Sequence, residues 1–93
     1  MYEIRYAQGA RKSLKRRRRS GSFPGGIFEE LLELFIRGKP LPHYFQDHSL
    51  QGEFMGYREC HLGFNLLVIY KRNEERKVIT ISEVGTHPEL FGE

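Results

Sequence analysis

The feature that most constrains the fold is an unbroken run of five apolar residues at positions 66–70, bordered by polar residues on both sides. Because the run does not alternate with polar positions, it predicts a β-strand that is buried on both faces. The preceding residues 57–65 supply titratable and polar groups, among them Arg58, Cys60 and His61. We therefore expect the run to form the centre of a core, with a site at its edge.

Length and composition limit the class of protein. A chain of 93 residues, 39% of them hydrophobic, suits one small domain over residues 1–93. The single cysteine, Cys60, excludes an internal disulfide and favours a reducing compartment, where it would be a small buried apolar residue. No apolar stretch approaches the roughly 20 residues that cross a bilayer, and the N-terminus does not resemble a signal peptide. These features predict a soluble cytoplasmic protein.

The spacing of apolar residues predicts two helices and four strands. In chain order these are a strand at residues 2–6, helices at 8–19 and 27–37, and strands at 53–61, 64–71 and 78–84. Gly56 is expected to be a bulge in the second strand, and residues 89–93 a short tail. The order strand, helix, helix, three strands indicates an α+β domain, with a helical hairpin packed on one face of an antiparallel sheet.

Basic residues are concentrated near the N-terminus. Eight of the fifteen Lys and Arg residues lie between Glu3 and Glu29, an interval that contains no acid. Such a cluster of positive charge favours the binding of a polyanion, either nucleic acid or an acidic partner protein. One side of the first helix is expected to contact phosphate, and the candidates are Lys12, Lys15, Arg16 and Arg19.

Three histidines lie at the ends of predicted strands, where they can converge: His48, His61 and His87. Two histidines can divide the roles of general base and general acid near neutral pH without a metal, as RNA cleavage by the 2′-hydroxyl requires. A nearby arginine would stabilise the charge on phosphorus; Arg58 is the nearest candidate and Arg76 a weaker one. The alternative is that the histidines are ordinary surface residues on loops.

An aromatic ring can hold a splayed base by stacking, and Phe91 lies four residues after His87. The alternative for Phe91 is an anchor that ties the C-terminus to the core. Glu59 points to the opposite face of its strand from Arg58, so both cannot serve one site. Cys60 and His61 are adjacent, which is poor geometry for two ligands of one ion, so neither a metal nor a cofactor is expected.

Several motifs in register resemble the bacterial RelE/ParE toxin superfamily, and most closely its YafQ-like mRNA interferases. They lie at residues 41–42, 47–52, 57–62, 67–71 and 85–91. The resemblance implies a RelE-like fold and a ribosome-dependent endoribonuclease toxin of a toxin–antitoxin system. It also implies mRNA cleavage that leaves a 2′,3′-cyclic phosphate. The implied partners are a cognate antitoxin, forming a hetero-oligomer, together with mRNA and ribosomal RNA, and no membrane.

The resemblance further implies roles for individual residues. His61 and His87 would be the acid and base, His48 would assist or orient the phosphate, and Phe91 would position the nucleotide. The remaining family position usually holds aspartate, but here it is Asn65. An amide can orient a neighbour by hydrogen bonding but cannot accept a proton as a base.

Two other functions remain open at this point. A ParE-like toxin inhibits gyrase by binding alone and needs no catalytic histidines, so the histidine set argues against it. A catalytically weakened RNA-binding relative is the second alternative, and Asn65 is the residue that favours it.

Overall fold

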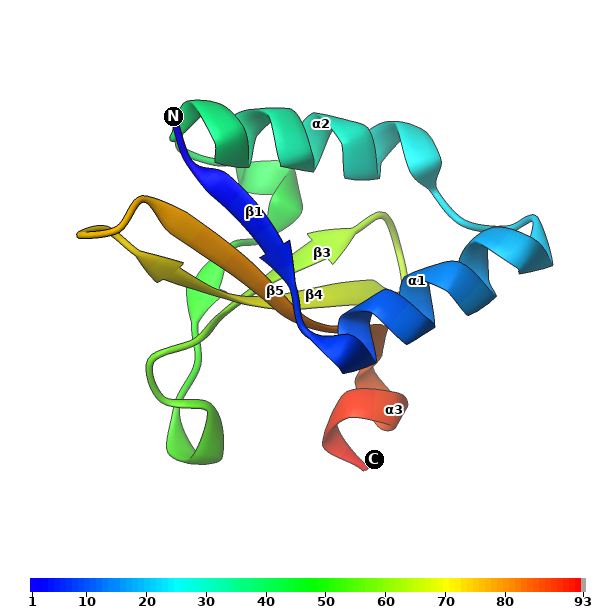
Figure 1. The fold of residues 1–93 in the computed structure, drawn as a ribbon. Helices are drawn as coiled ribbons and strands as arrows, with labels where there is room; N and C mark the ends of the chain where they lie inside the picture. The colour runs from blue at the N-terminus through cyan, green and yellow to red at the C-terminus, as the bar shows by residue number, and fades with distance from the viewer. Residues whose placement is uncertain (93) are drawn as a thin grey trace.

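The computed structural model describes residues 1–92; Glu93, the last residue of the predicted tail, lies outside the described residues. The elements are β1 (Glu3–Tyr6), α1 (Gln8–Ser20), α2 (Gly25–Arg37), η1 (His43–Phe45), β2 (His48–Ser49), η2 (Gly52–Phe54), β3 (Arg58–Leu62), β4 (Leu66–Asn73), β5 (Val78–Thr86) and α3 (His87–Phe91), where η1 and η2 are short 3-10 helices. The strands form one sheet in the order β1-β5-β4-β3-β2. Among the strands of residues 1–92, only β1 and β5 pair in parallel (Figure 1). The predicted α+β class is confirmed.

Strand β4 lies at the centre of the sheet and is buried on both faces, as its apolar run predicts. Each residue from Leu66 to Tyr70 exposes 8% of its surface or less. Leu66, Val68 and Tyr70 belong to the main core cluster, whereas Leu67 and Ile69 alternate to the other face. The sheet therefore has two distinct faces, and both are covered at its centre.

Helices α1 and α2 supply the main core from the same face of the sheet. Their buried apolar residues in that cluster are Ala10, Leu14, Phe28, Leu31 and Phe35. In Figure 1, α2 lies along one side of the sheet, while η2 and α3 project from the other. The predicted end of α2 at Arg37 is confirmed: Gly38 has φ of 66°, and a Cβ at Gly38 would lie 2.7 Å from the Tyr2 ring. None of the helices in residues 1–92 is long and apolar enough to cross a membrane.

Several predicted boundaries are wrong. β3 begins at Arg58 rather than at residue 53, and the two-residue strand β2 (His48–Ser49) lies between the predicted elements 27–37 and 53–61, where no strand is expected. Gly56 is not a bulge: it lies before β3 with φ of 94°. The irregularity is in β5, where Ile69 pairs with Glu83 but Tyr70 pairs with Ile81, which leaves Ser82 as the extra residue.

Residues 89–91 of the predicted tail belong to the helix α3, which begins at His87. Thr86 Oγ1 accepts a hydrogen bond from the Glu89 N–H at 3.4 Å, and the Thr86 N–H donates to Glu89 Oε1 at 2.7 Å. This capping box begins the helix, and Pro88 suits its first turn. Gly92 then ends the helix in the left-handed conformation.

Candidate active site

The alternation of β3 separates its side chains into two sets. Cys60 and Leu62 are fully buried in the main core under the helices. Burial raises the pKa of the Cys60 thiol, as expected for an inert buried residue. Glu59 and His61 point to the other face, the one from which η2 and α3 project.

On this face the Glu59 carboxylate lies between two histidines. Glu59 pairs across the sheet with His48. Its Oε2 is 3.3 Å from His48 Nε2 and 3.7 Å from His61 Nε2, and the two imidazole rings are 6.5 Å apart. The Glu59 side chain is only 8% exposed, whereas those of His48 and His61 are 51% and 23% exposed. A buried carboxylate thus contacts one exposed and one partly exposed imidazole.

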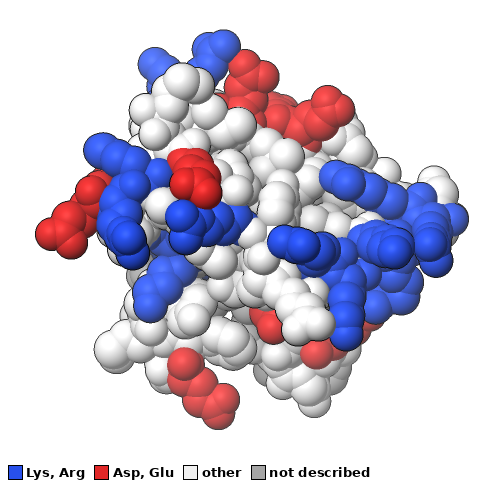
Figure 2. Space-filling view, viewed as in Figure 1, with Lys and Arg blue, Asp and Glu red and all other residues white. Residues whose placement is uncertain are grey.

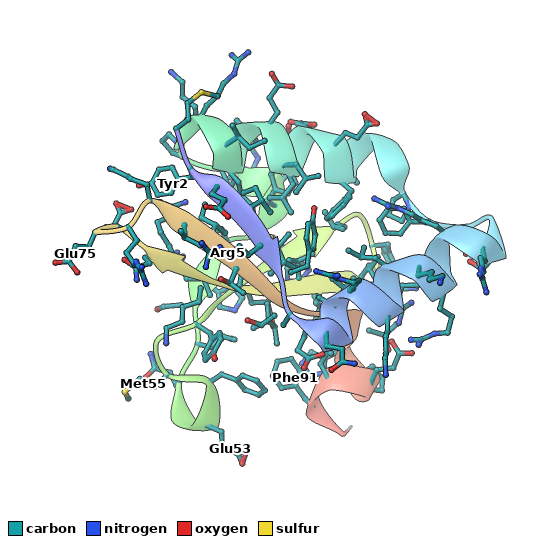
Figure 3. All side chains as sticks on the ribbon, viewed as in Figure 1. Tyr2, Arg5, Glu53, Met55, Glu75 and Phe91 are labelled. Atoms are coloured by element: carbon teal, nitrogen blue, oxygen red, sulfur yellow. The ribbon has the colours of Figure 1, made fainter. Side chains whose placement is uncertain are left out.

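A second cluster of predicted site residues lies on α3, beside η2. The His87 and Phe91 rings of α3 lie 4.8 Å apart. Phe91 also packs edge-on against Phe54 of η2 at 5.6 Å, and Phe54 packs against Tyr57 at 6.2 Å. In Figure 3, Phe91 lies on the side of α3 toward the loop that carries Glu53 and Met55. Phe91 is half-buried, so part of its ring remains available to a ligand.

Arg58 is not part of this site, contrary to the expectation that it faces the scissile phosphate. It projects to the helix face, where its Nη2 donates to Asp47 Oδ2 at 2.9 Å. The Tyr70 hydroxyl donates to the same carboxylate. The hydrogen bond with Asp47 raises the pKa of Arg58, and burial raises that of Tyr70. Arg58 therefore has a structural partner on the opposite face from His61.

Asn65 is exposed in the turn between β3 and β4. It lines a hollow of about 380 Å³ together with Arg17, Ser22 and Thr86. In the described part of the chain, no hydrogen bond joins Asn65 to His61. The structure thus does not place its amide where it would orient that imidazole.

A basic surface runs along α1. Lys12, Lys15, Arg16 and Arg19 are all exposed on this helix. Figure 2 shows lysine and arginine side chains gathered over the position of α1, while acidic side chains gather over α2. Arg17 differs from its neighbours because its side chain is only 19% exposed.

The sequence interpretation missed Glu59 as a member of the site. The signal was present, because Glu59 and His61 are two residues apart on a strand and so must share a face. Within residues 1–92, no set of three or more His, Cys, Asp or Glu side chains has an arrangement that could hold a metal ion.

Comparison with known proteins places this chain in a family. Residues 2–92 match the model of the bacterial toxin of type II toxin–antitoxin systems, YafQ. The chain belongs to the YafQ toxin family. A curated relative, the mRNA interferase toxin YafQ of Escherichia coli K12, is 40% identical over 63 residues, which are 67% of this chain and 66% of that protein. The matched segment thus spans slightly less than two thirds of the relative.

Solved YafQ structures confirm the fold. The alignment with a YafQ mutant from E. coli covers 99% of this chain and 100% of the mutant chain, with 30% identity and a TM-score of 0.87. The alignment with the matched chain of the E. coli DinJ–YafQ complex covers 99% of this chain and 100% of that chain, with 30% identity and a TM-score of 0.85. The α+β fold with a mostly antiparallel sheet is therefore shared with the solved YafQ structures.

Proposed function

We propose that this YafQ-family toxin is an mRNA interferase, an endoribonuclease that cleaves mRNA in the ribosomal A site by metal-independent acid–base catalysis. The observation that carries the proposal is the pair His48 and His61, held by the Glu59 carboxylate on the face of the sheet opposite α1 and α2. The name of the E. coli relative, mRNA interferase toxin YafQ, supports the substrate class. Residues 1–93 would form a single toxin domain that acts in the cytoplasm.

The reaction needs two proton transfers. An imidazole removes the 2′-hydroxyl proton, the 2′ oxygen attacks the adjacent phosphorus, and a second imidazole protonates the 5′ oxygen as the P–O5′ bond breaks. The products are a 2′,3′-cyclic phosphate and a 5′-hydroxyl. We assign the two transfers to His61 and His87, without deciding which is the acid.

The other groups would position the reactants. Glu59 fixes the orientation of His48 and His61, and it provides a carboxylate that Asn65 cannot provide. His48, the more exposed of the two imidazoles, would orient the phosphate. Phe91, half-buried between His87 and Phe54, would stack on a splayed base.

The basic surface of α1 would bind polyanions. Its exposed residues Lys12, Lys15, Arg16 and Arg19 suit ribosomal RNA during cleavage. An acidic segment of a cognate antitoxin would bind the same surface when the toxin is neutralised. The structure of a DinJ–YafQ complex supports a hetero-oligomer with an antitoxin.

Induced expression tests this function. Wild-type protein should arrest growth and cleave cellular mRNA, whereas the His87→Ala variant, produced at the same level, should do neither. Equal toxicity of the two proteins would contradict the assigned site. Growth arrest with DNA damage and intact mRNA would instead indicate a gyrase-binding toxin.

A further inference from the structure

Helix α3 is too short to be stable without contacts to the rest of the chain. It has five residues and carries both His87 and Phe91. Isolated helices of this length do not persist in water, because nucleation is costly. Its position relative to the sheet therefore depends on tertiary contacts, and these determine where His87 lies.

One contact is the close approach of α3 to β5. A Cβ added to the buried Gly85 would lie 3.0 Å from Leu90 Cδ2 and 3.1 Å from Glu89 Oε1. A side chain at position 85 would thus require the Leu90 and Glu89 side chains of α3 to shift. Gly85 allows the approach but does not hold the helix in place.

The second contact is polar and comes from α1. Ser13 is buried, and its hydroxyl donates to the Val84 carbonyl of β5 at 2.6 Å. Arg17 Nε donates to the same hydroxyl at 3.0 Å, and Arg17 Nη2 forms an ion pair with Glu89 of α3. Glu89 Oε1 is also the acceptor for the Thr86 N–H that begins the helix. One arginine therefore connects α1, β5 and the first turn of α3.

We propose that Arg17 is a positioning residue for cleavage: it fixes α3, and with it His87 and Phe91, against the end of β5. This inference deepens the proposed function and rests on it. Arg17 thus differs from its neighbours in the basic run. Arg16 and Arg19 are exposed and available to RNA, whereas the guanidinium of Arg17 is bound to Ser13 and Glu89.

The test compares Arg17→Gln with two variants that lose the same charge. Arg37→Gln breaks an exposed ion pair with Glu33 on α2. It is the control in which neither cleavage nor the position of α3 is expected to change. Arg16→Gln removes an exposed charge from the same basic run. Cleavage is measured on programmed ribosomes, and the order of α3 is measured by NMR exchange of the Gly92 amide, which donates to the Pro88 carbonyl at 2.8 Å.

We expect Arg17→Gln to lower kcat about tenfold with little change in KM, because a misplaced reacting group slows the chemical step. Exchange of the Gly92 amide should become about tenfold faster. Arg37→Gln should behave as wild type in both assays. Arg16→Gln should raise KM and leave the exchange of Gly92 unchanged.

Glu89→Gln provides an independent variant, because its amide oxygen can still accept the Thr86 N–H while the ion pair is lost. The double variant should lose no more than Arg17→Gln alone, since both changes remove the same Arg17–Glu89 ion pair. A raised KM in Arg17→Gln with normal Gly92 exchange would overturn the proposal and make Arg17 an RNA contact. If Arg17→Gln has the wild-type kcat, KM and Gly92 exchange rate, the proposal is also overturned. If wild type does not cleave mRNA, the proposed function fails, while the exchange data still decide whether Arg17 holds α3.

Discussion

A carboxylate lies beside basic side chains on each face of the sheet, but the two environments differ. On the helix face, Asp47 binds Arg58 and the hydroxyl of Tyr70, whose side chain is fully buried in the core. On the other face, Glu59 is buried, while its partner His48 is exposed to solvent and its partner His61 is partly exposed. The first arrangement uses its hydrogen bonds to hold the fold together, and the second holds titratable groups where a substrate can reach them.

The largest effect on stability is expected on the helix face. Phe35 is fully buried, and its ring lies 4.6 Å from that of Tyr70. Phe35→Ala should lower the free energy of unfolding by about 4 kcal/mol, because it leaves a cavity in the core. Urea denaturation followed by circular dichroism measures this change.

Phe91→Ala is the matched change on the other face. It should lower the free energy of unfolding by only about 1 kcal/mol, since Phe91 is half-buried. It should nevertheless impair cleavage. A loss of stability as large as that of Phe35→Ala would identify Phe91 as an anchor of the C-terminus instead.

Glu59→Gln should reduce cleavage about 100-fold, because the amide has the same size but no charge to hold two imidazoles in place. Its thermal midpoint should stay close to that of wild type. Single-turnover cleavage on programmed ribosomes measures the first quantity and calorimetry the second. Full activity in this variant would remove Glu59 from the site.

Asp47→Asn is the corresponding change on the helix face. It weakens the acceptor for Arg58 and Tyr70, so the free energy of unfolding should fall by about 2 kcal/mol. The cleavage rate per folded molecule should be retained. A selective loss of cleavage would show that the two faces are less independent than the structure indicates.

The smallest effect is the loss, at acid pH, of the contacts that Glu89 makes with Thr86 and Arg17. Hydrogen bonding from the Thr86 N–H, together with Arg17, lowers the pKa of Glu89. A lowered pKa in the folded state means that the contact stabilises the fold above the ordinary value of about 4.3 and is lost as the pH falls through the lowered value. The Thr86 amide shift in NMR should titrate below pH 4.3 in wild type but not in Glu89→Gln. A pH-independent shift in wild type would contradict this assignment.

The sequence predicted elements with strong local signals and missed those that depend on distant contacts. β4 and α2 were predictable, because a continuous apolar run and a broad apolar helical face leave few alternatives. α3 and β2 were not, since five and two residues carry little periodicity. α3 is held in place by Arg17, which is 72 residues away from its partner Glu89.

The candidate site shows the same limit. The spacing of β3 already separated Arg58 from Glu59, but the sequence did not reveal that Asp47 binds Arg58. Nor did it reveal that β2 would bring His48 beside Glu59, because a two-residue strand sets that pairing. Local alternation assigned side chains to faces, and the tertiary structure determined their partners.

The most direct test is the cleavage of defined mRNA on programmed ribosomes by purified wild-type and His61→Ala proteins, with the RNA ends identified by mass spectrometry. Wild type should leave a 2′,3′-cyclic phosphate and a 5′-hydroxyl. His61→Ala should be at least about 100-fold slower with an unchanged unfolding midpoint, since its imidazole lies outside the main core. Cleavage by His61→Ala at the wild-type rate, or products that carry a 5′-phosphate, would contradict acid–base catalysis by the histidines.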